Sequence, residues 1–232
     1  MHDHNPGIIC LQETKLGNAP YNPGLNYIIY NSAPPAGDRA HGGAAIIIDK
    51  SIQHSLIQLN SPLQVVAVTA ILRKSITVCS IYLPGAVGFT NLDLQNLINQ
   101  LPPPFILLGD FNAHNPLWGG SNLDQYGGIV ENILNTNDVI LYNDGSMTYH
   151  NIYTNTFSAI DLSICSSSIA MEFNWSVNSD LHGSDHYPIH LTFCENIPSS
   201  SPPKWKVQEA DWVKYRQGTT MEREFESFPS HL

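Results

Sequence analysis

The chain has 232 residues, of which 42% are hydrophobic and 13% are charged, and its formal net charge at pH 7 is -10. Domains of roughly 150 residues are common, so this length predicts one full domain and a shorter additional segment. The acidic balance argues against a protein that holds nucleic acid with a broad basic surface. It leaves open either ordinary acidic solubility or a carboxylate site that reaches phosphate through a bound cation.

Cysteine spacing and hydropathy argue against further classes of protein. The four cysteines form no Cys-x-x-Cys pair, so neither a zinc site nor a disulfide framework is expected. The first residues lack the apolar stretch of a signal peptide, and no apolar run reaches the length of about 18 residues that suggests a membrane span. A protein of a reducing compartment, without membrane contact, is therefore expected.

Short apolar runs rich in β-branched residues, each bounded by Gly, Pro, Asn, Ser or Asp, are typical of β-strands. In chain order they predict strands at residues 8–11, 27–30, 44–48, 65–72, 76–83, 105–108, 139–141, 160–165 and 189–193. The residues from Leu72 to Ser75 read as a turn, so the two strands on either side of it are expected to pair.

Two segments have the apolar spacing of amphipathic helices, and they are residues 92–101 and 128–137. Many strands and few helices indicate an α/β protein of layered sheets with helices outside them. Residues 197–203 are rich in Pro and Ser and read as a linker, and residues 204–217 read as a short helix. We therefore expect a catalytic domain in residues 1–195, followed by a linker and the start of another segment in residues 196–232.

The strongest chemical motif is Gly109-Asp110-Phe111-Asn112, which follows a predicted strand. At strand spacing, Asp110 and Asn112 point to the same side. A carboxylate and a carboxamide together can take a proton from water and hold that water beside a phosphate. A turn that only closes a strand would have the same composition. His114 follows this motif closely and is a candidate substrate contact.

Glu13 ends the first predicted strand as a single carboxylate. A hard cation such as Mg²⁺ takes oxygen ligands and usually only one or two protein carboxylates. Glu13 is therefore a candidate metal ligand, and the alternative is a solvent-exposed Glu at a strand end.

A third motif, Ser184-Asp185-His186, leads into the last predicted strand. Asp185 could bind a metal or act as a base, the imidazole of His186 could contact a phosphate, and Ser184 is a candidate substrate contact. Asp161 opens another apolar run, where an acidic side chain that faces the core needs a partner. A histidine partner would be oriented and kept charged by it. The alternative is an Asp that faces solvent.

Tyr82 ends a predicted strand directly before Pro84 and Gly85 lead into a turn. A phenol in that place could donate a hydrogen bond to a phosphate oxygen. The alternative is a half-buried strand tyrosine with no chemical role.

The order of these motifs resembles the endonuclease/exonuclease/phosphatase superfamily, the group of AP endonucleases and deoxyribonuclease-I-like enzymes. Residues 9–15 and 109–114, with the glycine-led segment 42–46, are similar to the endonuclease domains of non-LTR retrotransposons of the jockey and R-element type. The resemblance covers residues 8–195, and residues 205–216 resemble the segment that leads toward the reverse transcriptase in these elements. The chain has no Tyr-x-Asp-Asp polymerase motif.

The resemblance implies a four-layer α/β sandwich, in which two mostly antiparallel sheets pack together with helices outside them. It also implies a Mg²⁺ cofactor, with Mn²⁺ as an alternative, held by Glu13 with assistance from Asp185. Asp110 would activate the attacking water, and Asn112 would orient that water or the phosphate.

Further roles follow from the same resemblance. Tyr82 and His186 would stabilise the charge of the transition state, and Asp161 would orient His186. The implied activity is a Mg²⁺-dependent endonuclease that nicks double-stranded DNA in the nucleus. The resulting 3′-hydroxyl would prime the reverse transcriptase domain of the same element. Two alternatives stay open: a phosphatase or phosphodiesterase that acts on a small substrate, and a catalytically inactive remnant.

The beginning of the chain departs from the family pattern. The family starts with a strand that carries an Asn, followed by a helix, whereas only seven residues precede Ile8 here. We therefore expect an N-terminally truncated domain whose neighbouring strands lack a backbone partner.

The segment 148–158 is expected to be a loop and is the candidate for contact with a DNA groove. Changing Tyr149 or Tyr153 is expected to alter the preferred cleavage site while leaving the nicking of random plasmid intact.

Overall fold

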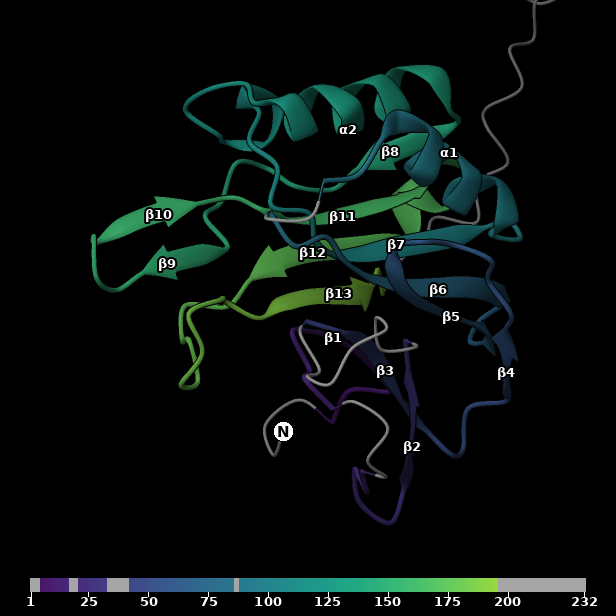
Figure 1. Cartoon of the computed structure of the whole chain (residues 1–232). Coiled ribbons are helices and arrows are strands. Elements are labelled where there is room, and N and C mark those ends of the chain that lie inside the picture. The colour runs from purple at the N-terminus through teal and green to yellow at the C-terminus, as the bar shows by residue number, and fades with distance from the viewer. Residues whose placement is uncertain (1–4, 17–20, 33–41, 86–87, 196–232) are drawn as a thin grey trace, which may run out of the picture. The chain divides into compact units, whose positions relative to one another are not determined.

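The computed structural model describes residues 5–16, 21–32, 42–85 and 88–195, and Figure 1 shows their arrangement. Contacts within the chain group Met1–Glu195 into one compact unit. The linker and the short helix that the sequence predicts within residues 196–232 lie outside the described residues, and the domain boundary stays a prediction.

A six-stranded sheet with the order β4-β5-β6-β7-β11-β8 is the centre of this unit. Neighbouring strands are antiparallel except for β6 and β7, which run parallel. The central strand β6 is buried along nearly its whole length, so both faces of the sheet are covered. The strands are β4 (His54–Ile57), β5 (Gln64–Ile71), β6 (Ser75–Tyr82), β7 (Phe105–Asp110), β11 (Asp161–Ser166) and β8 (Val139–Leu141).

A second layer of strands packs on one face of this sheet. It consists of a three-stranded sheet, β1-β3-β2, and the antiparallel pair β12-β13. Ile46 and Ile48 belong to the same buried apolar cluster as Val66 and Val68 of β5, which places this cluster between the layers. The strands of this layer are β1 (Ile8–Gln12), β2 (Tyr27–Asn31), β3 (Ala44–Asp49), β12 (Phe173–Val177) and β13 (Ile189–Phe193).

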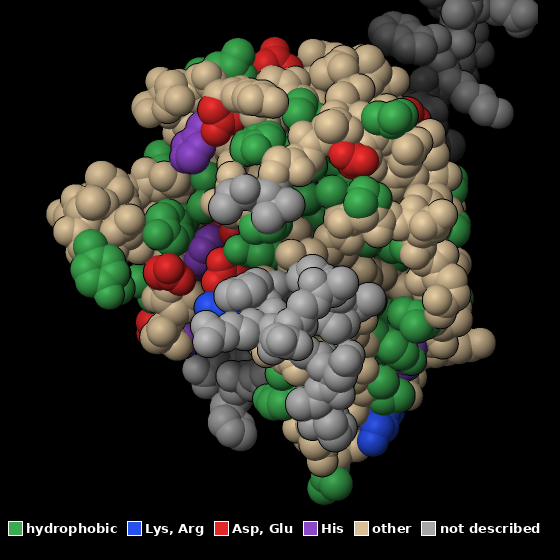
Figure 2. All heavy atoms as spheres, in the orientation of Figure 1, with side chains coloured by type: hydrophobic (Ala, Val, Ile, Leu, Met, Phe, Trp, Pro, Cys, Tyr) green, Lys and Arg blue, Asp and Glu red, His purple; other side chains and the backbone are tan. Residues whose placement is uncertain are grey.

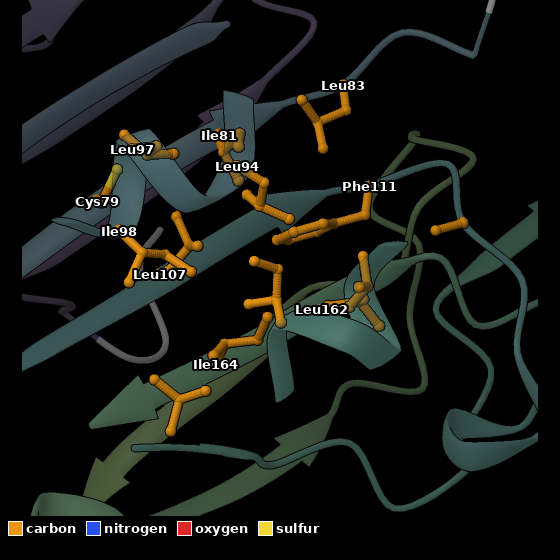
Figure 3. Packing of buried hydrophobic residues seen from close by; sticks show 14 of the residues in the cluster. Cys79, Ile81, Leu83, Leu94, Leu97, Ile98, Leu107, Phe111, Leu162 and Ile164 are labelled. Atoms are coloured by element: carbon orange, nitrogen blue, oxygen red, sulfur yellow. The ribbon is translucent and has the colours of Figure 1, made fainter. Parts of the chain in front are cut away.

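Helices α1 (Asn91–Gln100) and α2 (Gln125–Thr136) cover the opposite face of the six-stranded sheet. Leu94 and Leu97 of α1 pack with Ile81 and Leu107 in a second buried cluster, which Figure 3 shows from close by. Successive residues of β6 alternate between the two clusters, because side chains alternate along a strand. Ile81 therefore faces the helices, and Tyr82 faces the second layer of strands.

A small hairpin extends from the left side of the molecule in Figure 1. It is made by β9 (Tyr149–Asn151) and β10 (Thr156–Ser158), which pair antiparallel. Two short 3-10 helices complete the elements, η1 (Pro116–Trp118) and η2 (Ser167–Glu172). In the part of the chain that the structure describes, no helix has the length and apolar character needed to span a membrane.

The α/β class, the two packed and mostly antiparallel sheets and the β5-β6 hairpin are confirmed, and every predicted strand is present. Strands β4, β9, β10 and β12 were not predicted from the sequence. The segment expected as a loop at residues 148–158 is a hairpin instead, because its strands are short and carry polar residues that give no apolar run. Helix α2 begins at Gln125, before the predicted residue 128, because the side chain of Asp124 caps it by accepting from the backbone of Gly127.

Among the described residues, β1 and β2 each pair only with β3, and β12 and β13 pair only with each other. Such edges occur in any open sheet, so the N-terminal truncation stays a prediction.

Candidate active site

Three adjacent strands of the six-stranded sheet bring three predicted site residues into one row. In the parallel pair β6-β7, Tyr82 lies opposite Asp110, and in the antiparallel pair β7-β11, Asp110 lies opposite Asp161. Neighbouring strands lie about 4.8 Å apart, and side chains of directly opposed residues project from the same face. The row therefore faces the second layer of strands, since Tyr82 belongs to the cluster between the layers.

Gly109 and Phe111 fix the direction of the acidic side chain between them. A Cβ atom on Gly109 would lie 1.8 Å from the carbonyl oxygen of Ile81, so only glycine allows β6 and β7 to approach this closely. Phe111 is fully buried in the cluster below the helices. Because one side chain of this motif is absent and the next is buried on the helical side, Asp110 is directed to the other face.

Asp110 is almost completely buried and is held by Asn112. The backbone N–H of Asn112 donates to Oδ1 of Asp110 (2.9 Å), and its side-chain Nδ2 donates to Oδ2 (2.9 Å) and to the carbonyl of Leu83 (3.0 Å). Burial, with the charge of Asp161 second, raises the pKa of Asp110 to about 7, against the opposing effects of the Asn112 backbone and of His186. A carboxylate with such a pKa can accept and release a proton near neutral pH.

His186 lies in the loop before β13, and its ring contacts both carboxylate oxygens of Asp161. Its Nδ1 lies 3.0 Å and 2.9 Å from the two carboxylate oxygens of Asp161. Burial alone would lower the pKa of His186, but the hydrogen bond and the charges of Asp161, Asp110 and Asp185 outweigh it and raise the pKa to about 9. The imidazole is therefore positively charged near neutral pH and can donate a hydrogen bond through Nε2.

Glu13 follows β1 in the second layer and joins the row through Tyr82. The phenol of Tyr82 donates to Oε1 of Glu13 (2.6 Å), and Nζ of Lys15 lies 3.5 Å from Oε2. Burial, the hydrogen bond to Glu13 and the charges of Glu13 and Asp110 raise the pKa of Tyr82 above its usual range. The phenol stays protonated and remains a donor.

The donor chemistry of this site fits a hard divalent cation. Among the described residues, no group of three or more His, Cys, Asp or Glu side chains converges to hold a metal. Mg²⁺ does not need such a group, because it commonly binds through one or two carboxylates, water and substrate phosphates. Glu13 supplies a half-exposed carboxylate next to other acidic groups, and a cation there would offset the acidic charges that, after burial, raise the pKa of Asp110.

The remaining predicted residues lie at different distances from this centre. The hydroxyl of Ser184 accepts from the backbone N–H of His186 (3.0 Å), so it shapes the histidine turn. Asp185 is exposed, and its charge contributes to the raised pKa of His186. His114 forms a separate pair with Asp124 (3.0 Å), two residues beyond Asn112.

Thr148 is a buried residue of this site that the sequence analysis did not identify. Its hydroxyl accepts from the backbone N–H groups of Ile160 (3.1 Å) and Asp161 (3.0 Å). Its own backbone binds Ser158 (2.9 Å) and Tyr187 (2.7 Å). Thr148 therefore ties the base of the hairpin, the start of β11 and the histidine loop together. No local pattern marks it, because its partners are distant in the sequence.

Tyr149 connects the hairpin to His186. The rings of Tyr149 and His186 lie 4.8 Å apart, and the two residues form a β-bridge. The expectation that a change at Tyr149 affects only site preference is therefore too simple. Tyr153 at the hairpin tip is fully exposed.

Acidic and histidine side chains gather on the hairpin side of the face shown in Figure 2, and Lys and Arg are sparse there. The described ranges contain four basic side chains. Lys15 lies beside Glu13, whereas the other three bind elsewhere, Lys50 to Leu25, Arg73 to Cys194 and Lys74 to Glu172. A bound anion would thus meet few fixed positive charges at this site.

A family of proteins described as endonuclease-reverse transcriptase matches residues 76–190. Two curated relatives come from Drosophila melanogaster. A probable RNA-directed DNA polymerase from transposon X-element is 26% identical over 193 residues, which cover 82% of this chain and 21% of that protein. An RNA-directed DNA polymerase from mobile element jockey is 27% identical over 213 residues, which cover 89% of this chain and 23% of that protein. The chain thus spans about a fifth of the length of these relatives.

Two solved structures share the fold. The endonuclease domain of TRAS1, a telomere-specific non-LTR retrotransposon, superposes with a TM-score of 0.67 at 21% identity, over 81% of this chain and 85% of that chain. The AP endonuclease LMAP from Leishmania major superposes with a TM-score of 0.64 at 15% identity, over 82% of this chain and 79% of that chain.

The contacts of Thr148 generate a prediction. Thr148→Val should leave two buried N–H groups unpaired, lowering the free energy of unfolding by about 1–3 kcal/mol. It should also move the pKa of His186 below about 9, because Asp161 loses its support. Thr148→Ser, which keeps the hydroxyl, serves as the control. Urea unfolding and titration of His186 by NMR check both effects, and equal behaviour of the two variants would contradict the role of the hydroxyl.

Proposed function

We propose that the chain is a divalent-metal-dependent endonuclease that nicks double-stranded DNA. The match of residues 76–190 to the endonuclease-reverse transcriptase family, and the similarity to polymerases of mobile elements and to the fold of a non-LTR retrotransposon endonuclease domain, support this proposal. The observation that carries the proposal is the convergence of a base, a charged donor, a neutral donor and a metal-binding carboxylate. Asp110, His186, Tyr82 and Glu13 supply these groups where the two layers of strands meet.

Asp110 is the general base in this proposal. A pKa of about 7 lets its carboxylate accept a proton from the attacking water without holding that proton permanently. Asn112 keeps the carboxylate in place through two hydrogen bonds, and its side chain can also orient the water or the phosphate. The water oxygen bonds to phosphorus and the bond to the 3′ oxygen breaks. The products are a 5′-phosphate and a 3′-hydroxyl whose proton comes from solvent.

His186 and Tyr82 stabilise the negative charge that grows on the phosphate oxygens. His186 is charged near neutral pH and Tyr82 is neutral, so each can donate to an oxygen of the transition state. Asp161 is a positioning residue, because it acts through His186.

Glu13 would hold the cation, Mg²⁺ or Mn²⁺, and Asp185 would assist it from the histidine loop. When bound, the cation supplies positive charge that polarises the phosphate. That contribution is needed here, since few basic side chains of the described ranges lie beside the site.

The substrate we propose is duplex DNA in the nucleus, held by the hairpin, His114 and Ser184. The hairpin starts beside His186, and its tip presents the exposed side chains of Ile152 and Tyr153. His114 has its Nδ1 fixed by Asp124, which leaves Nε2 to meet a phosphate. In a longer polypeptide like those of the relatives, the nick would prime a reverse transcriptase.

Supercoiled-plasmid nicking is the direct test of the activity. The chain should nick with Mg²⁺ and not with EDTA, and Asp110→Ala and His186→Ala should each lose about 100-fold or more in rate. The exposed pair Asp180 and His182, whose Oδ2 and Nδ1 atoms lie 3.8 Å apart, offers matched control substitutions that should keep the activity. A folded chain that never nicks would favour an inactive remnant, and one that hydrolyses inositol phosphates instead would favour a small substrate.

The pH dependence of nicking follows from two pKa values. The rate should rise as Asp110 loses its proton, through pH about 7 or below once a cation is bound, and should fall as His186 loses its proton through pH about 9. Asp161 raises the pKa of both groups, so Asp161→Asn should shift both limbs to lower pH. A rate–pH profile that keeps both limbs in place in this variant would refute the assignment.

Two substitutions separate recognition from chemistry. Tyr153→Ala should change the map of cleaved positions on a linear duplex while plasmid nicking continues, because the side chain is exposed at the tip. His114→Ala should raise KM by removing a phosphate contact and should leave the map unchanged. An unaltered map for Tyr153→Ala, or an unaltered KM for His114→Ala, would remove the respective residue from the DNA interface.

A further inference from the structure

A pair of glycines at the start of β3 holds the turn that follows Glu13. The backbone N–H of Lys15 donates to the carbonyl of Gly42 (2.7 Å), and that of Thr14 donates to the carbonyl of Gly43 (3.3 Å). Glu13 and Lys15 both have a φ of 50°, a left-handed conformation that non-glycine residues seldom adopt. Such a turn persists only when its surroundings hold it, and these two hydrogen bonds are part of that support.

The two glycines also touch the neighbouring site residues directly. A Cβ atom on Gly42 would lie 2.5 Å from a ring carbon of Tyr82 and 2.6 Å from Oε1 of Gln64. A Cβ atom on Gly43 would lie 2.7 Å from Oγ1 of Thr14. The glycine backbone is thus in close contact with the phenol on one side and with the Glu13 turn on the other, and no side chain would fit between them.

Gln64 fixes this glycine pair to the six-stranded sheet. Its side-chain Oε1 accepts a hydrogen bond from the backbone N–H of Gly43. Gln64 lies directly opposite Tyr82 in the register of β5 and β6. These contacts are connected. Gln64 binds Gly43, the glycine pair binds the turn after Glu13, Glu13 accepts from Tyr82, and Tyr82 pairs with Gln64 across the two strands.

We propose that Gln64 is a positioning residue that holds the Glu13 carboxylate and the Tyr82 phenol as one unit for binding of the divalent cation. The inference rests on the proposed function, because it concerns the same metal site. Gln64 acts at a distance from the reacting atoms, through the glycine pair and the turn. Removal of its acceptor oxygen loosens the turn that carries the metal ligand, while Asp110 and His186 keep their own supports. Substitution of residues that support a metal ligand typically weakens metal binding in this way.

The experiment compares Gln64→Met with a matched control. The control is Gln100, which lies on α1, away from the site. Its Oε1 accepts a hydrogen bond from the backbone N–H of Asn60 (2.8 Å), so Gln100→Met removes the same kind of bond. Gln64→Met should raise the Mg²⁺ concentration for half-maximal nicking about tenfold or more, with a smaller effect on the rate at saturating Mg²⁺. Gln64→Glu, which keeps an oxygen in the same place, should restore most of the affinity.

Amide hydrogen exchange tests the same inference without activity. In Gln64→Met the N–H groups of Thr14 and Lys15 should exchange faster than in the unaltered chain, whereas in Gln100→Met they should not. If the unaltered chain shows no metal-dependent nicking, the proposed function fails, and exchange together with Mn²⁺ binding followed by electron paramagnetic resonance still decides the role of Gln64. Unchanged exchange in Gln64→Met, or an equal change of metal affinity in Gln100→Met, would overturn the inference.

Discussion

The close parallel approach of β6 and β7 is the constraint on which the site depends. It requires the absence of a side chain at Gly109, where a Cβ atom would collide with the carbonyl of Ile81. The same approach sets Tyr82 beside Asp110, and the antiparallel pairing of β7 with β11 adds Asp161. Three polar groups thus come to lie in a row at one edge of the six-stranded sheet. A wider spacing of β6 and β7 would separate the phenol of Tyr82 from the carboxylate of Asp110.

The row brings two acidic side chains together in a buried place, and burial, with repulsion second, raises the pKa of Asp110. Two carboxylates on neighbouring strands cannot both be ionised without cost in a buried place. The surroundings of the two carboxyl groups, Asp161 and Asp110, differ. Asp161 is paired with His186, which becomes positively charged, while the buried Asp110 has a raised pKa of about 7. Other sites likewise contain two acids whose different environments give them different roles.

The sequence allowed the strands and the chemical motifs to be predicted, because both are local patterns. Strand ends followed by polar residues placed Asp110, Glu13 and Tyr82 where the structure has them, at the ends of β7, β1 and β6. The residues that hold these side chains in place could not be predicted in the same way. Thr148 and Gln64 act on residues that only pairing register and tertiary packing bring near, and their hydrogen bonds leave no local trace in the sequence. The hairpin was expected as a loop for a related reason, since cross-strand contacts hold its short polar strands.

The residues that position the site side chains fall into two groups, and each group holds one half of the site. Thr148 and the hairpin hold the half formed by Asp161 and His186, and the glycine pair holds the half formed by Glu13 and Tyr82. The second half joins strands of both layers, so its geometry depends on the packing between them. A polar link crosses that packing, because Nε2 of Gln12 donates to the buried hydroxyl of Ser80 (3.0 Å), which donates in turn to the carbonyl of Leu11 (3.2 Å). Such a fully satisfied buried network specifies one arrangement of the two layers. The relative position of the Glu13 and Asp110 carboxylates therefore depends on hydrogen bonds as well as on the apolar core.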